Sequence, residues 1–85
     1  MGPAAWAAVA RALGQALLSS LFSGENNIVS IIAAEIQSAI LNNDIETARG
    51  LLRDLACRHR KQYEVFLKKF ANKLPAELIA ELKSM

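Results

Sequence analysis

The first apolar stretch of the chain has the spacing of a helix with one narrow polar stripe. Three polar residues recur at steps of four, which places them on one line along a helix: Arg11, Gln15 and Ser19. Pro3 favours a first helical turn, because its missing N–H would find no helical partner there, and Gly24 is a good terminator. We therefore predict a helix from Pro3 to near Phe22.

The second apolar stretch covers more than half of a helical circumference with apolar side chains. Asn26 or Asn27 is expected to cap it, because an asparagine side-chain oxygen accepts hydrogen bonds from the free backbone donors of a first turn. Asn42 and Asn43 end it at about Leu41. A helix this rich in β-branched isoleucine depends on packing more than on intrinsic propensity, so its apolar faces need covering surfaces.

A third helical stripe follows, with two further leucines beside it: Ala48, Leu52, Leu55, Tyr63, Phe66 and Phe70, then Leu51 and Leu67. Asp44 is expected to cap this helix, and Glu46 adds negative charge at the positive end of its dipole. No proline interrupts the segment before Lys73. One helix of that length is unusual in a small domain, so we expect a break at Gly50 or within residues 58–62.

A short last helix is predicted from Pro75 to about Lys83, and Leu74 before the proline is expected to be extended. No segment has the alternation of apolar and polar residues that a strand requires. The sequence therefore predicts a single helical domain over residues 1–85. Its class is all-α, a small helical bundle of three main helices and a short C-terminal helix, open to completion by oligomerisation.

The first two predicted helices carry more apolar surface than one neighbour can cover. A buried large aliphatic side chain contributes about 1.5–3 kcal/mol, so an exposed isoleucine face favours association. We expect self-association, as a homo-oligomer or with a helical protein partner. Two alternatives stay open: the last helix folds back through Leu78, Ile79 and Leu82 to close a monomer, or the first helix attaches to a membrane. The candidate core or interface anchors are Trp6, Leu13, Leu17, Ile32, Ile36 and Ile40.

Charge is concentrated in the second half of the chain. Of ten basic and eight acidic side chains, three precede residue 42: Arg11, Glu25 and Glu35. Five later cations form a predicted basic face for an acidic partner: Arg58, Arg60, Lys61, Lys68 and Lys69. Two pairs have the spacing of intrahelical ion pairs, Asp54 with Arg58 and Glu64 with Lys68.

Three aromatic residues are interleaved with these cations, as on some nucleic-acid-binding surfaces: Tyr63, Phe66 and Phe70. They also fall on the apolar stripe of the third helix, and we expect them in the core. Binding of nucleic acid is therefore kept as a weaker alternative to binding of an acidic protein surface.

The residues that could support catalysis are few. Cys57 and His59 are the only cysteine and histidine, and their spacing directs them to different sides of a helix, away from a nucleophile–base arrangement. We expect Cys57 at the edge of the core. One histidine and one cysteine are too few for a structural zinc site, and no glycine-rich phosphate loop is present. We predict a non-enzymatic protein without metal or cofactor. The lone cysteine and the lack of a basic segment before the apolar stretch favour an intracellular, cytoplasmic location, with membrane association left open.

Overall fold

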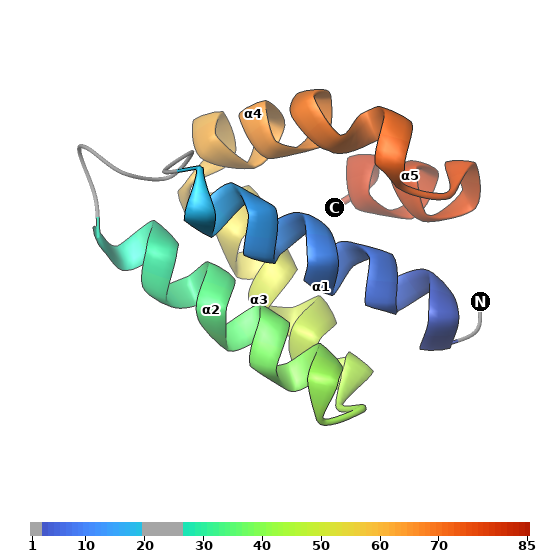
Figure 1. Cartoon of the computed structure of the whole chain (residues 1–85). Coiled ribbons are helices and arrows are strands. Elements are labelled where there is room, and N and C mark those ends of the chain that lie inside the picture. The colour runs from blue at the N-terminus through green and yellow to red at the C-terminus, as the bar shows by residue number, and fades with distance from the viewer. Residues whose placement is uncertain (1–2, 20–26) are drawn as a thin grey trace.

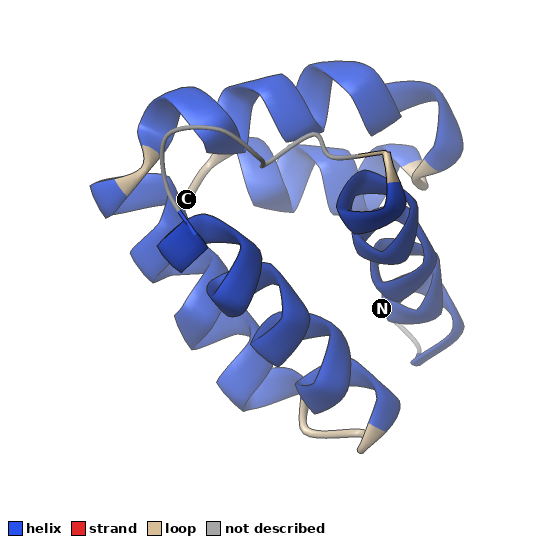
Figure 2. Cartoon of the chain, turned by 60° about the vertical axis from the view of Figure 1, so that its left-hand side comes forward, coloured by secondary structure: helices blue, strands red, loops and turns tan. Residues whose placement is uncertain are grey.

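The computed structural model describes residues 3–19 and 27–85, and over these ranges the chain is helical and contains no strand (Figures 1 and 2). The all-α class predicted from the sequence is confirmed. The described residues form five α-helices and one 3₁₀ helix: α1 (Pro3–Leu18), α2 (Asn27–Leu41), α3 (Ile45–Arg58), α4 (Arg60–Phe70), η1 (Ala71–Lys73) and α5 (Ala76–Lys83).

The helices surround a core to which all five α-helices contribute. Helix α2 packs against α1 and against α3, and α5 packs against α4. In Figure 1, α1 crosses in front of α3, with α2 below it and with α4 and α5 above it. The largest fully buried side chains include Trp6, Leu13, Ile36, Leu52, Leu55, Tyr63, Phe66, Phe70, Leu78 and Leu82. The predicted stripe along residues 48–70 therefore faces the core, and the polar stripe of α1 is exposed.

The turn between α2 and α3 has a defined backbone conformation. Asn43 adopts a φ of 61°, in the left-handed region that asparagine tolerates better than most residues. Its N–H donates to the Ile40 carbonyl at 3.0 Å, and the N–H of Asp44 donates to the Ala39 carbonyl at 2.8 Å. This pair of bonds is the Schellman arrangement of a helix C-terminus. The Asp44 carboxylate accepts from the N–H of Thr47 at 3.4 Å, so the predicted helix end and the predicted cap are both confirmed.

The long third segment breaks at His59, inside the predicted range 58–62, and it continues as a helix through Gly50. His59 leaves helical geometry with φ −131° and ψ 53°. Its N–H still donates to the Leu55 carbonyl at 2.8 Å, and its carbonyl accepts from the N–H of Tyr63 at 3.0 Å. The backbone groups next to the break are thus hydrogen-bonded, which allows α4 to change direction at low energetic cost.

The ends of α1 and α5 can also be compared with the predictions. Leu74 is extended, with φ −115° and ψ 148°, and α5 follows Pro75 as predicted. Helix α1 ends at Leu18, before the predicted end near Phe22, and the Ser19 hydroxyl donates back to a helix carbonyl. Phe22, Gly24 and the capping side chains predicted at 26 and 27 lie outside the described residues.

Helix α5 folds back on the molecule, as the closed-monomer alternative expects, and Leu78 and Leu82 are fully buried. It packs on α4 and not on α2, because the short connection over residues 71–75 keeps it beside α4. The outward side of α2 retains Ile28 and Ile31, whose exposed fractions are 55% and 57%. Part of the apolar surface predicted for the second helix is therefore solvent-facing in the single chain.

Candidate functional site

The six predicted anchors belong to the core of the single chain. Four are buried and two are partly buried against the same core: Trp6, Leu13, Ile36 and Ile40, then Leu17 and Ile32. Their side chains pack against neighbouring helices of the same molecule and do not form an exposed patch. Of the two roles that the sequence allowed them, the structure supports the core role.

The predicted basic face divides into parts with different surroundings. Arg58 forms the expected ion pair with Asp54, with 3.0 Å between Arg58 Nε and Asp54 Oδ1. The pairing predicted between Glu64 and Lys68 is wrong, because Glu64 accepts from Arg60 Nε at 3.0 Å. Arg60 lies one turn before Glu64 and also donates through Nη1 to the Met85 carbonyl at 3.0 Å, which holds its guanidinium near the carboxylate.

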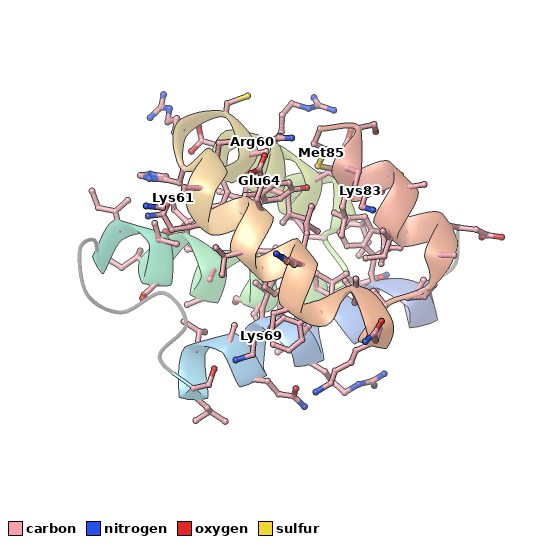
Figure 3. All side chains as sticks on the ribbon, turned by 90° about the horizontal axis from the view of Figure 1, so that it is seen from above. Arg60, Lys61, Glu64, Lys69, Lys83 and Met85 are labelled. Carbon is pink, nitrogen blue, oxygen red and sulfur yellow. The ribbon has the colours of Figure 1, made fainter. Side chains whose placement is uncertain are left out.

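The three lysines of the predicted face are exposed: Lys61, Lys68 and Lys69. Figure 3 shows Lys61 and Lys69 at separate places along α4, with Lys69 over α1 and with Lys83 contributed by α5. None of these four ammonium groups forms a hydrogen bond or ion pair with another described residue. Within the part of the chain that the structure describes, these ammonium groups therefore have no anionic partner.

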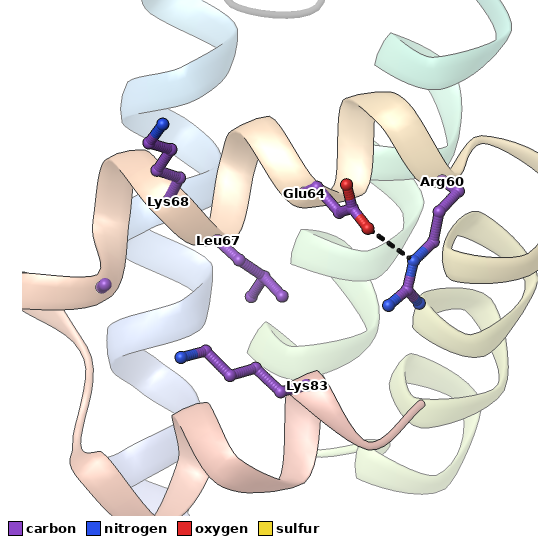
Figure 4. A pocket seen from close by; sticks show the side chains of 6 residues that line it. Arg60, Glu64, Leu67, Lys68 and Lys83 are labelled. Carbon is purple, nitrogen blue, oxygen red and sulfur yellow. Dashed lines mark hydrogen bonds and ion pairs between the residues drawn. The ribbon is translucent and has the colours of Figure 1, made fainter.

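A groove of about 410 Å³ separates the exposed sides of α4 and α5 (Figure 4). The residues that line it are Arg60, Glu64, Leu67, Lys68, Ala71 and Lys83. Four of them lie on one side of α4 at helical spacing, Ala71 begins η1, and Lys83 enters from α5. Leu67 and Lys83 project into the same groove from the two helices. The structure thus combines two residues of the predicted face with a lysine that the sequence reasoning did not select.

The groove has an apolar floor and a positively charged rim. Ala71 and the 7% exposed Leu67 supply the apolar surface. Arg60 is paired with Glu64, and the ammonium groups of Lys68 and Lys83 form no ion pair with any described residue. Arg58, Lys61 and Lys69 do not line this groove. The arrangement is suited to a ligand that carries carboxylates beside an aliphatic group.

One buried hydrogen bond and one partly exposed ion pair connect α5 to its neighbouring helices. The Tyr63 hydroxyl donates to the Leu82 carbonyl at 2.6 Å, one residue before Lys83. Tyr63 is fully buried, and this burial raises the pKa of its hydroxyl from 10.0 to about 12. On the other side of α5, Glu81 accepts from Arg49 at 3.3 Å. These contacts join α5 to α4 and to α3 at Leu82 and Glu81, the two residues before Lys83.

Arg49 of α3, which pairs with Glu81 of α5, also contacts α1. The Arg49 guanidinium carbon lies 5.4 Å from the centroid of the Trp6 ring, in the range of a cation–π contact. Trp6 itself is 1% exposed. Helices α1, α3 and α5 therefore meet around one partly buried cation, and the tryptophan predicted as an anchor contributes to that contact from inside the core.

Cys57 differs from its predicted position at the core edge, because its side chain is exposed. At this point α3 directs Leu55 and Ala56 into the core, which turns Cys57 outward. It lines a second hollow, of about 380 Å³, together with Arg49, Arg53 and other residues. Among the residues that the structure describes, no group of three or more histidine, cysteine or acidic side chains is placed to hold a metal ion.

The residues on which the nucleic-acid and membrane alternatives depend lie mostly inside the molecule. Tyr63, Phe66 and Phe70 are 0–2% exposed, which confirms their predicted core position and removes them as platforms for stacking bases. The larger apolar side chains of α1 also pack into the core, except Leu18. Within residues 3–19 and 27–85, no helix has both the length and the apolar character that crossing a bilayer requires.

Comparisons with known proteins found no match for this chain. No protein-family model, no curated protein and no solved structure matches this chain. The helical arrangement and the basic groove are therefore the features from which a function can be inferred.

Proposed function

We propose that this protein is a non-enzymatic helical interaction module that binds an acidic protein segment in the groove between α4 and α5. The observation that carries the proposal is the combination of Lys68 and Lys83, which form no ion pair with a described residue, with the apolar floor at Leu67. Each lysine comes from a different helix, so a bound segment would contact both walls of the groove.

The expected ligand has carboxylates next to an aliphatic side chain. An exposed ion pair contributes only about 0.2–1 kcal/mol, so charge alone gives weak and salt-sensitive binding. Burying one aliphatic side chain adds about 1.5–3 kcal/mol at full burial. A segment that satisfies both requirements is preferred over a purely acidic or a purely apolar one, and this combination is the basis of specificity.

An acidic protein segment is favoured over nucleic acid by the same groove. Phosphate backbones supply negative charge but no aliphatic group for Leu67, and the aromatic residues of α4 are buried. Nucleic acid would then bind through charge alone, with a strong dependence on salt and no dependence on the groove floor.

Fluorescence anisotropy with a labelled peptide of alternating glutamate and leucine tests the proposal. The Lys68→Ala/Lys83→Ala variant is expected to bind this peptide about tenfold more weakly, because both groove ammonium groups are lost. The matched control is Lys61→Ala/Lys69→Ala, which removes the same charge from α4 outside the groove. This control is expected to stay within about twofold of the parent protein, since it changes only long-range electrostatics.

Two results would overturn the proposal. One is an absence of peptide binding at low salt by the parent protein. The other is an equal loss of binding in the two double variants, which would indicate general attraction to a basic surface. A lysine–leucine peptide of the same length serves as the charge control and should not bind. Short duplex DNA that binds more tightly than the acidic peptide would favour the nucleic-acid alternative.

The predicted self-association stays a proposal. The six anchors that the sequence suggested for it lie in the core, so another surface would have to form the contact between copies.

A further inference from the structure

The turn between α2 and α3 carries an exposed leucine and, a few residues later in the sequence, two exposed carboxylates. Leu41 is 74% exposed, and Asp44 and Glu46 are exposed as well. A single exposed leucine is common on protein surfaces and indicates nothing by itself. Within six consecutive residues, however, the turn combines one exposed aliphatic group with two negative charges, and this combination is complementary to the cations and the apolar floor of the α4–α5 groove.

The charges of the turn and of the groove are complementary. Glu46 forms no hydrogen bond or ion pair with another described residue, as is also true of Lys68 and Lys83 in the groove. Leu41 of the turn is the aliphatic group that would pack on the apolar floor at Leu67. Leu41 lines a hollow of about 300 Å³ together with Arg11 of α1. The Asp44 and Glu46 carboxylates do not line this hollow.

The turn is also preorganised for binding. The left-handed Asn43 and the two hydrogen bonds of the Schellman arrangement fix its backbone. The Asp44 carboxylate is held by Thr47, whose hydroxyl donates to Asp44 Oδ2 at 2.7 Å. A rigid projecting turn loses little conformational entropy when it docks, which favours it over a flexible acidic segment.

The two complementary surfaces lie on opposite sides of one molecule. In Figure 1 the α2–α3 turn is at the bottom, and α4 and α5 are at the top. The molecule measures 34 × 24 × 23 Å along its principal axes, so the turn does not reach the groove of its own chain. A contact between them joins different copies through different surfaces, and such a heterologous contact repeats from copy to copy.

We infer that the acidic partner of the groove is a second copy of this chain, which places its α2–α3 turn between α4 and α5. The inference rests on the proposed function, because it names the ligand of the same groove. Leu41 of one copy packs on Leu67 of the next, and Glu46 and Asp44 approach Lys83 and Lys68. Association is head-to-tail, grows with protein concentration and weakens with salt.

Light scattering of two blocked variants and of their mixture tests this inference. Lys68→Glu/Lys83→Glu blocks the groove and keeps the turn, whereas Leu41→Ser/Glu46→Lys blocks the turn and keeps the groove. At low salt the parent protein should exceed its chain mass of 9.3 kDa as concentration rises. Each variant alone should stay at that mass. An equimolar mixture of the two should form a complex of twice the mass and stop there, because only one functional junction is left.

Matched controls separate this contact from other causes. Lys61→Glu/Lys69→Glu makes the same change of charge as the groove variant and should associate like the parent protein. Circular dichroism verifies that every variant is folded. If Glu46→Lys impairs folding at the start of α3, Leu41→Ser/Glu46→Gln replaces it and should raise the dissociation constant by about tenfold.

The inference is overturned if the parent protein keeps a mass of 9.3 kDa at all concentrations, or if the mixture of blocked variants stays monomeric while the parent associates. It also fails if only Ile31→Asp, on the outward side of α2, lowers the mass. In each case the result of the acidic peptide assay decides separately whether the proposed function holds. Peptide binding that still depends on Lys68 and Lys83 would leave the proposed function intact and exclude only the second copy as ligand.

Discussion

Two helix pairs in this molecule, α1–α2 and α4–α5, bury their apolar faces with side chains of different size. The α1–α2 pair buries five alanines among its larger apolar side chains: Ala10, Ala12, Ala16, Ala33 and Ala39. The Gln37 side chain reaches across to α1, so a Cβ added to Gly14 would lie 2.8 Å from the Gln37 amide nitrogen. The α4–α5 pair uses aromatic and leucine side chains, and its outer edge is a groove.

We expect the α1–α2 pair to govern stability and the α4–α5 pair to govern the proposed binding. Helices α1 and α2 carry only Arg11 and Glu35 as charged residues, so their contact is dominated by packing. Helices α4 and α5 bury their large side chains on one side and present cations on the other. The short α5 covers α4 only in part, and the uncovered strip becomes a groove whose rim is charged. Variants in the first pair should therefore change folding, whereas selected variants in the second should change binding.

The largest expected effect is in the α1–α2 region. Ile36→Asp places a carboxylate at a position with no exposure and should cost more than about 4 kcal/mol, a large part of the stability of a domain this size. Loss of helical circular dichroism is the expected result. Ile31→Asp, on the exposed side of the same helix, should change the free energy of unfolding by less than about 1 kcal/mol. Equal effects of the two substitutions would contradict the described burial of α2.

An intermediate effect is expected where α4 holds α5. Tyr63→Phe removes the hydrogen bond to the Leu82 carbonyl and should lower the free energy of unfolding by about 0.5–1.5 kcal/mol. Chemical denaturation at neutral pH measures this loss. The same variant should also weaken binding of the acidic peptide, because the backbone next to Lys83 is less firmly held. Unchanged stability would mean that the hydroxyl does not contribute to the position of α5.

Tyr63 also predicts a pH dependence. Its pKa is about 12 in the folded chain against 10.0 in the unfolded chain, so the folded state favours the neutral hydroxyl. Its stabilising contribution is complete below pH 10 and is lost as pH rises through about 12. Because the chain has one tyrosine, tyrosinate absorbance reports this group alone. The stability difference between the parent protein and Tyr63→Phe should narrow over this pH range, and a constant difference would contradict the raised pKa.

The smallest effects are expected from two helical glycines. Gly50→Ala on α3 meets no atom within 4 Å and should stabilise the protein by about 0.5–1 kcal/mol through helix propensity. Gly14→Ala should give a smaller gain, because the new methyl group displaces the Gln37 amide, which donates to the Ala10 carbonyl at 3.1 Å. In a Gln37→Ala background, Gly14→Ala should regain the full effect. Thermal unfolding measures both gains, and equal gains in the parent background would contradict the contact between the Gln37 side chain and α1 at Gly14.

Local patterns were sufficient for most helix boundaries. The polar stripe of α1, the stop after Leu41, the cap at Asp44 and the extended Leu74 follow from interactions between residues close in sequence. The break between α3 and α4 was predicted only as a range, because no proline or glycine marks His59 itself. Its position is set by packing on both sides, where Leu55 and Tyr63 must both face the core.

The candidate site was less accessible to sequence reasoning. Arg60 and Lys68 were selected because cations cluster along α4, but Lys83 belongs to another helix and had no signal of its own. The orientation of Cys57 and the pairing of Glu64 with Arg60 were also mispredicted. In each case several partners or directions satisfy the same helical spacing, and only the neighbouring helices choose among them.

The sequence by itself determined that this chain is all-α, where most of its helices end, and which stripes are apolar. These properties depend on backbone preferences and on a periodicity of a few residues, which a linear sequence contains in full. Only the tertiary structure decided that the predicted anchors are core residues and that α5 lies beside α4 and forms a groove with it. Those outcomes depend on which apolar faces meet, and that choice is made by packing among helices far apart in the sequence.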